Sequence, residues 1–375
     1  MFLFSFYFFM ESYFCSSWLF IQLIRPMKKI QILFFALNIL SATLVKGQTI
    51  ESLAKELPPY FSMLTTWGVR PEWDETSEHI YFLNKLVGDV FKINVTTKEV
   101  TQVTSGFYHG GIHRVLCLAN GDLLLAMGPP IFDSTNPEKD RHSGLGLYVL
   151  TKENPNLPYP LGASCDEGPA VSKSSLKIAW TVKGQREIKM GKISYENGVP
   201  SLKQVETVIT YQDSSAYVRL ETQDFRPPLD EELMYTHYWG DAKDQYFNSQ
   251  VFGFNLRTKE TKKYTQYPKS YNEAEGIFPS GAFMVIESDR HQPLDQRNKY
   301  KLDIYKLKLD GSGETERLAD FSTRYLNRIK SDNPVVDKTG RLIAHQFGFQ
   351  KGAGDGRGIF LFDLDAYEKA KSVKK

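Results

Sequence analysis

Three of the seven histidines stand in comparable places along the chain. His237, His291 and His345 each come at or just after the end of a short apolar run, where a polar loop begins. Imidazoles combined with carboxylates can bind zinc, copper, iron or nickel, and oxygen ligands favour manganese. If the fold brings these histidines together, they predict a divalent-metal site with Mn or Zn as the ion. The alternative is that each imidazole only hydrogen-bonds its own loop.

A second group of side chains lies in loops of the same kind and could bind a polar molecule, either a glycan or a protein. Trp239 could stack on a sugar ring or pack against a neighbouring strand. Asp289 and Arg290 could contact a ligand or form an ion pair that orders their loop. The predicted ligand-binding residues are His109, His113, Glu167, His237, Trp239, Glu275, Asp289 and Arg290.

Other kinds of chemistry find no support in the sequence. There is no Gly-x-Ser-x-Gly elbow for a serine nucleophile. The glycine-rich run at 351–358 leads into no predicted helix, so it lacks the helix N-terminus of a phosphate cradle. With 46 basic and 44 acidic residues the chain is near neutral, which gives no electrostatic footprint for nucleic acid or an anionic membrane.

The elements that must position these residues repeat along the chain. A polar segment, a short turn and an apolar run recur, each followed by an alternating run rich in aromatics. Four short strands per unit of roughly 40 to 60 residues is typical of a β-propeller blade. Six units fit, and we predict an all-β, six-bladed β-propeller; a sandwich is the alternative. The repeats begin within 70–84, 112–128, 167–182, 224–240, 275–291 and 332–348.

The sixth unit ends after IFLFDLDAYEKA without a fourth strand. The segment 48–66, within it PYFSMLTT at 59–66, would supply that strand and leave no sheet edge unpaired. The propeller then spans 67–366, followed by a basic tail at 367–375. Loops that lead into the innermost strands and loops that join second to third strands share one face, which would gather five of the seven histidines.

The stretch DIYKLKLDGSGETERL at 303–318, with FPSGAFMVIESDRH before it, resembles the TolB-like, WD-like propeller repeat. The resemblance implies the fold and no particular chemistry, because such propellers serve as binding modules and as enzymes. Blades two and four depart from the pattern. A weaker resemblance, to oligogalacturonate lyases, implies His and Gln metal ligands on the central face. His237, His291, His345 and Gln346 would be those ligands, although that family's closely spaced Gln and His run has no aligned counterpart here.

The beginning of the chain reads as an export signal. Positive residues at 27–29, an apolar stretch and a cut before Gln48 predict a signal peptide at 27–47. Residues 1–26 read as a translated segment upstream of the true start, or alternatively as a membrane anchor. We expect a periplasmic or secreted protein with no stable membrane insertion after the signal is removed, acting as a monomer.

Two functions of different classes follow. The first is an exported propeller that binds a polar ligand in its central funnel. The second is a metal-dependent polysaccharide lyase of the oligogalacturonate type, which would use the histidines. Cys117 and Cys165 could pair in an exported protein or stand as two separate buried side chains.

Overall fold

The computed structural model describes residues 50–131, 133, 135, 136, 138–141, 144–212, 217–240, 248–267, 269–294, 301–324, 329–349 and 357–373. These residues belong to one compact unit that begins at Ile50. The predicted signal peptide and the segment before it lie outside the described residues, as do His142 and most of the glycine-rich run. None of the helices in the described ranges is long and apolar enough to cross a membrane.

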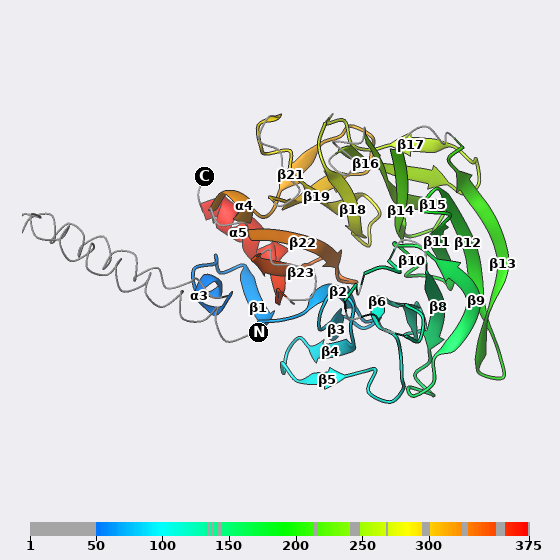
Figure 1. Cartoon of the computed structure of the whole chain (residues 1–375). Coiled ribbons are helices and arrows are strands. Elements are labelled where there is room, and N and C mark those ends of the chain that lie inside the picture. The colour runs from blue at the N-terminus through cyan, green and yellow to red at the C-terminus, as the bar shows by residue number, and fades with distance from the viewer. Residues whose placement is uncertain are drawn as a thin grey trace, which may run out of the picture. The chain divides into compact units, whose positions relative to one another are not determined.

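Within these ranges the strands form six antiparallel sheets of four strands each, which is the six-bladed β-propeller predicted from the sequence (Figure 1). The innermost strands of blades one to six are β2 (Val69–Trp73), β6 (Ile112–Cys117), β10 (Ala170–Val171), β14 (Tyr217–Phe225), β18 (Asn272–Ile277) and β22 (Ile329–Val336). The second strands are β3 (His79–Leu83), β7 (Leu123–Met127), β11 (Lys177–Val182), β15 (Glu232–Gly240), β19 (Phe283–Ser288) and β23 (Leu342–Phe349).

The outer half of each blade completes the sheet. The third strands are β4 (Val90–Asn94), β8 (Leu145–Leu150), β12 (Glu187–Glu196), β16 (Asn248–Asn255), β20 (Asp303–Lys308) and β24 (Ile359–Asp363). The outermost strands are β5 (Val100–Gln102), β9 (Tyr159–Cys165), β13 (Val199–Thr210), β17 (Thr261–Lys263), β21 (Thr315–Arg317) and, for blade six, β1 (Phe61–Thr65).

Strand β1 closes the ring. It pairs antiparallel with β24, with Phe61 opposite Phe362 and Thr65 opposite Ile359. The first strand of the chain therefore completes the last blade, and no other strand of the described chain is shared in this way. The pairing covers what would otherwise be an exposed sheet edge.

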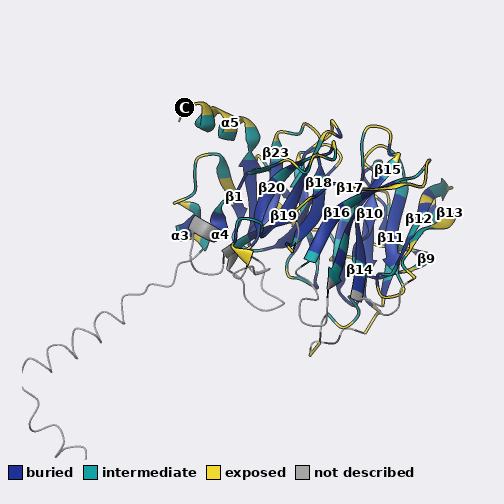
Figure 2. Ribbon diagram, turned by 90° about the horizontal axis from the view of Figure 1, so that it is seen from above, coloured by how far each residue is buried: buried dark blue, intermediate teal, exposed yellow. Residues whose placement is uncertain are grey.

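The core lies between the blades. Six clusters of buried apolar residues each join two successive blades, including blade six with blade one through Leu64, Ile80, Phe82 and Ile359. Buried residues run along the strands, whereas exposed residues gather in the turns (Figure 2). Burial of these faces is the main favourable contribution to folding.

In the described part of the chain, three helices lie outside the blade pattern: α3 (Ile50–Ala54), α4 (Phe321–Arg324) and α5 (Leu364–Val373). Leu53 and Phe321 are fully buried in the cluster between blades five and six, and Tyr367 packs against the same cluster. Residues of the basic tail therefore form a helix, which the sequence analysis did not anticipate.

Five of the six innermost strands contain an irregularity of register, in β2, β6, β14, β18 and β22. At two of them a residue other than glycine has a positive φ: Arg70 at 54° and Asn333 at 48°. A bulge turns the side chains next to it toward a new direction. Here the bulges place polar side chains at the centre of the ring.

The two cysteines do not form a disulfide. Cys117 and Cys165 are free and buried, and they belong to different apolar clusters. Each acts as a small apolar side chain, as one of the two interpretations of the sequence held.

Phe61 tests the closure of the ring, because its ring lies 4.7 Å from that of Phe321 and 5.0 Å from that of Phe362, centroid to centroid. We expect Phe61→Ala to lower the free energy of unfolding by about 2 kcal/mol, since the residue is half-buried and truncation leaves a cavity. Ser62→Ala, an exposed neighbour on the same strand, should change it by less than about 0.5 kcal/mol. Equal urea midpoints for the two variants would show that β1 does not hold the ring closed.

Candidate functional site

A polar pocket of about 410 Å³ lies at the end of the central channel where the innermost strands begin. We call it the axial pocket. All six blades contribute to it, and charged side chains dominate its wall. It is lined by Arg70, Leu86, Arg114, Arg141, Glu167, Gln185, Arg219, Glu221, Tyr238, Tyr271, Glu273, Glu287, Lys330, Asp332, Asn333, Gln346 and Arg357.

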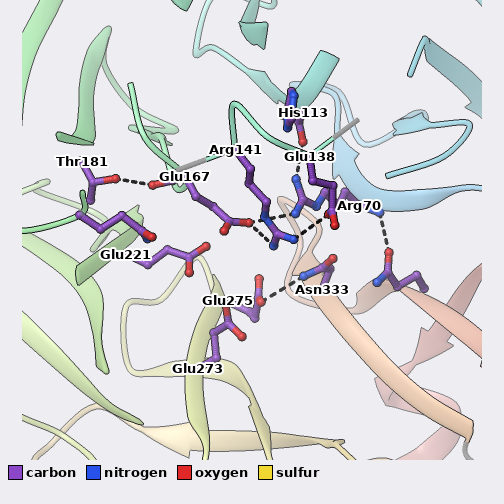
Figure 3. Close-up of polar contacts among 12 residues, drawn as sticks. Arg70, His113, Glu138, Arg141, Glu167, Thr181, Glu221, Glu273, Glu275 and Asn333 are labelled. Atoms are coloured by element: carbon purple, nitrogen blue, oxygen red, sulfur yellow. Dashed lines mark hydrogen bonds and ion pairs between the residues drawn. The ribbon is translucent and has the colours of Figure 1, made fainter. Parts of the chain in front are cut away.

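Glu167 is held by two arginines from other blades (Figure 3). Arg70 Nη2 donates to Glu167 Oε1 at 2.9 Å, and Arg141 Nη2 donates to the same oxygen. Arg70 also donates to the backbone carbonyl of His113. Arg141 also forms an ion pair with Glu138, with Nη1 3.1 Å from Oε1, so in this cluster two cations are balanced by two carboxylates.

Asp332 of blade six is neutralised in the same way. Lys330 and Arg357 both form ion pairs with its carboxylate, and the Arg357 Nη1 to Asp332 Oδ2 distance is 2.9 Å. Burial alone would raise the pKa of Asp332, but the two cations outweigh burial and hold it below its ordinary value. This group of three side chains has a net charge of +1. Gln346 completes this side by accepting a hydrogen bond from the backbone N–H of Arg70 at 2.8 Å.

Four buried glutamates of blades four and five face these cations across the channel. We call them the acidic arc: Glu221, Glu273, Glu275 and Glu287. None of the four forms an ion pair with any residue that the structure describes. Ligand oxygens of Glu273, Glu275 and Glu287 lie within 4.8 Å of one another, and this is the only such group of possible metal ligands in the described ranges.

Burial and mutual repulsion raise the pKa of every member of the acidic arc. Burial, then the neighbouring Glu167 and Glu273, raise the pKa of Glu221 to about 8. Burial and Glu287 raise the pKa of Glu273 to about 7. Burial and Asp332 raise the pKa of Glu287 to about 7, and the pKa of Glu275 is raised well above its ordinary value. A nearby cation would lower these pKa values and favour loss of the protons.

Two tyrosines stand beside the acidic arc. The hydroxyl of Tyr238 donates to Glu221 Oε2 at 3.1 Å, and the hydroxyl of Tyr271 donates to Glu273. Their ring centroids are 6.0 Å apart. Carboxylates beside aromatic rings form a surface suited to an organic cation.

Arg114 differs from the other arginines of the pocket. Its side chain comes from β6, and its Nε is buried without a hydrogen-bond partner. No described residue forms a hydrogen bond or an ion pair with its guanidinium. Burial would lower the pKa of Arg114, but Glu275, Glu221 and Glu167 outweigh burial and raise it. The guanidinium therefore stays charged, in the field of carboxylates that it does not touch.

A second pocket, of about 470 Å³, lies where the innermost strands end. Its wall is largely apolar, with Trp73, Phe225 and Ile277 among its residues, and it meets the axial pocket at Arg70 and Arg114. Burial raises the pKa of Asp224 in this wall to about 7.

The structure does not bring together the three histidines that the sequence offered as metal ligands. His237 packs among Tyr211, Trp239 and Phe252 on the face of its sheet opposite to Tyr238. His345 lies among phenylalanine rings, with Nδ1 2.7 Å from Ser331 Oγ. Burial lowers the pKa of both His237 and His345 to about 4.

His291 lies in a third place, away from the axial pocket. Its Nε2 is 2.7 Å from Ser322 Oγ, and its Nδ1 is 3.4 Å from Asp303 Oδ2. The three imidazoles therefore occupy three separate packing environments. Of the four proposed metal ligands, only Gln346 lines the axial pocket.

The other predicted binding residues are divided between the channel and the loops. Glu167 lines the axial pocket, and Glu275 lines the apolar pocket, with Asn333 of both pockets hydrogen-bonded to it. His113 reaches the site through its backbone carbonyl. His109 is tied to Asp89, with Nε2 3.1 Å from Asp89 Oδ1.

The remaining three predicted residues order their own surroundings. Trp239 packs beside His237, with Lys263 over its ring. Asp289 accepts a hydrogen bond from the backbone of Tyr271. Arg290 donates to Ser288, Asn272 and Thr315, so it holds the loop after β19 in place.

Several residues of the pocket were not selected from the sequence, among them Arg70, Arg114, Arg141 and Glu221. The sequence held a usable signal for Arg70, Arg114 and Glu221. Each lies within the first strand of a repeat, where a charged side chain can point only into the central channel. Arg141 lies in the long loop before β8, which is the feature that made blade two depart from the repeat pattern. That departure supplies Arg141 to the axial pocket.

No protein-family model matches the chain, and no curated protein matches it. Solved structures with a similar fold include an oligogalacturonate lyase in complex with manganese, at 11% identity and a TM-score of 0.48, covering 79% of this chain and 76% of that one. TolB from Acinetobacter baumannii has 11% identity and a TM-score of 0.46, covering 84% and 66%. An auxiliary nutrient binding protein from Bacteroides thetaiotaomicron has 12% identity and a TM-score of 0.49, covering 79% and 68%.

These similarities concern the fold alone. The resemblance to TolB-like propellers and to oligogalacturonate lyases, stated from the sequence, is confirmed at that level. The chemistry of this chain has to be argued from its own pocket.

The raised pKa values predict how stability depends on pH. A glutamate titrates near 4.5 when unfolded, whereas Glu221 in the folded chain titrates near 8. Between these values the folded chain binds more protons than the unfolded chain, so the free energy of unfolding falls as the pH rises through this window. We expect urea midpoints measured across the window to decrease.

Glu221→Gln should flatten this decrease, because it removes one of the buried groups that must lose a proton. Glu99→Gln, an exposed residue before β5, is the matched control and should leave the slope unchanged. A midpoint that stays level or increases between pH 4.5 and 8 would contradict the protonated state of the acidic arc.

Proposed function

We propose that the protein is an exported binding protein that takes a charged polar ligand into the axial pocket of its propeller. The observation that carries this proposal is Arg114. The Nε of this half-buried guanidinium is buried without a hydrogen-bond partner, and no described residue forms an ion pair with it or with the acidic arc that shares its pocket of about 410 Å³. Leaving a buried charged group unpaired costs several kcal/mol in general, on the order of 3 to 5. A ligand that bonds to these groups removes that cost.

The backbone supports the same proposal. Arg70 and Asn333 hold positive φ angles that disfavour residues other than glycine, and such conformations cost about 1 to 3 kcal/mol each. Both residues line the axial pocket, at bulges of the innermost strands. Strained residues of this kind persist where they position a binding site.

The pocket favours one of the two ligand classes that the sequence left open. Stacking on a sugar was expected of Trp239 with its neighbour Tyr238, but Trp239 packs beside His237 away from the axial pocket, and Tyr238, which lines it, has its hydroxyl bonded to Glu221. The walls are instead charged, with both signs present. We therefore favour a peptide or another charged small molecule over a neutral glycan. We further propose export to the periplasm or the medium, which rests on the predicted signal peptide at 27–47. We propose that the exported protein acts as a monomer.

A divalent metal at Glu273, Glu275 and Glu287 is a second candidate, favoured by the 4.8 Å spacing of their oxygens. Three carboxylates are hard oxygen ligands, which suit manganese better than zinc. The lyase hypothesis has less support, because its histidines lie apart.

Binding can be measured by isothermal titration calorimetry of the full chain against a panel of peptides, free amino acids and oligosaccharides. For any ligand of the axial pocket we expect Arg114→Gln to weaken binding about 10- to 100-fold, since a hydrogen bond to a charged group contributes about 1.5 to 3 kcal/mol. Arg257→Gln, whose side chain is 75% exposed and lies 3.6 Å from Glu231, should leave the affinity unchanged. The proposal fails if no class binds, or if Arg114→Gln binds as the unchanged chain does.

The metal candidate has its own test, equilibrium dialysis against MnCl₂ followed by elemental analysis. Here we expect about one ion per chain, lost in Glu287→Gln because a hard cation needs all three carboxylates. His345→Ala should retain the ion, since that side chain is elsewhere. A chain that retains no manganese rejects this candidate.

A further inference from the structure

We propose that the ligand of the axial pocket is a small zwitterion, whose organic cation faces the acidic arc and whose anionic group faces Arg114. The inference rests on the proposed function and adds the chemical class of the ligand. It depends on how the two signs of charge are distributed around the channel.

The glutamates of the negative side come from blades four and five, where Arg219 of β14 also lines the pocket. Glu221 comes from β14, Glu273 and Glu275 from β18, and Glu287 from the end of β19. In Figure 3, Glu221, Glu273 and Glu275 lie around one central space, across from the arginines of blades one and two. Glu275 and Glu287 are bridged by Asn333, whose Nδ2 is 3.4 Å from an oxygen of each. An amide hydrogen bond supplies no positive charge, so no described residue gives the acidic arc a directly bonded cation.

The tyrosines make an organic cation a better match than a bare ion. Tyr238 and Tyr271 line the pocket and each donates its hydroxyl proton to a glutamate of the acidic arc. Their rings lie beside the carboxylates, where an ammonium or guanidinium could contact ring and carboxylate together. A metal ion gains little from an aromatic ring, and it would be repelled by the Arg114 guanidinium nearby.

The positive side belongs to blades six, one and two. Arg70 and Arg141 are committed to Glu167, and Lys330 and Arg357 are committed to Asp332. Arg141 also pairs with Glu138, so the first of these clusters is balanced, and the cations of both clusters are already bonded. The guanidinium of Arg114, by contrast, is not bonded to a described residue. The paired N–H donors of a guanidinium match the geometry of a carboxylate or a phosphate.

A ligand with a single charge would satisfy only one side. A simple amine would neutralise the acidic arc and leave Arg114 unbonded, whereas a simple carboxylate would pair with Arg114 and leave the arc protonated. A zwitterion satisfies both sides at once. The pocket volume of about 410 Å³ also suits a small organic molecule rather than a lone ion.

The test uses a series of ω-amino acids from glycine to 8-aminooctanoate, each compared with the n-alkylamine and the n-alkylcarboxylate of the same chain length. The full chain is expressed with its own leader, and binding is measured by isothermal titration calorimetry. We expect at least one amino acid to bind ten-fold or more tightly than both of its singly charged analogues. A ten-fold difference corresponds to about 1.4 kcal/mol.

Two variants assign the two halves of the ligand to the two sides of the pocket. Arg114→Gln should remove the preference for the amino acid over the alkylamine, and Arg114→Lys should restore part of it. Glu221→Gln combined with Glu273→Gln should remove the preference over the alkylcarboxylate. Arg257→Gln is the control for both, and a thermal unfolding curve for each variant verifies that the fold is intact.

The possible outcomes separate this inference from the proposed function. If the alkylamine or the alkylcarboxylate binds as tightly as every amino acid, or if only Mn²⁺ binds, the zwitterion is rejected. If no amino acid binds but a peptide or an oligosaccharide does, in a manner that Arg114→Gln abolishes, the zwitterion is rejected while the binding function stands. If nothing binds, both are rejected.

Discussion

The pairing of β1 with β24 is the interaction on which the rest of the molecule depends. It joins the first described strand to the last and so places blade one beside blade six. Only then can the backbone of Arg70 donate to Gln346, 276 positions further along the chain. The axial pocket takes residues from all six blades, so it exists only when the ring is closed.

Closure creates a second constraint, because the innermost strands converge on one channel and bury charged side chains there. Charged residues placed there must bond to one another or to a ligand. Glu167 and Asp332 each meet two cations, whereas neither Arg114 nor the acidic arc forms an ion pair with a residue that the structure describes. The incomplete part of this charge network is what distinguishes a binding site from a structural ion-pair cluster. The raised pKa values of the glutamates are the electrostatic consequence of the same incompleteness.

The fold could be predicted from the sequence because the repeat of four short strands is long-range information that many residues share. The site could be predicted only in part, for a local reason. Sequence alternation tells which side chains share a face, but each bulge in an innermost strand reverses that alternation. In β15, a difference of one position separates Tyr238, which lines the pocket, from His237, which packs away from it. The histidines were selected for their chemistry, whereas burial makes His345 and His237 neutral packing residues.

The contact between the two ends of the described chain has a consequence for the architecture. Tyr60, just before β1, packs on Tyr367 of α5 with ring centroids 5.3 Å apart, and Lys371 of the same helix bonds to Glu316 in blade five. Both ends are therefore fastened at one seam of the ring, beside the only blade built from two distant parts of the sequence. A ring of this kind has no intrinsic first blade. A circular permutant, in which the present ends are joined and new ends are opened in an outer turn, would therefore enclose the same channel.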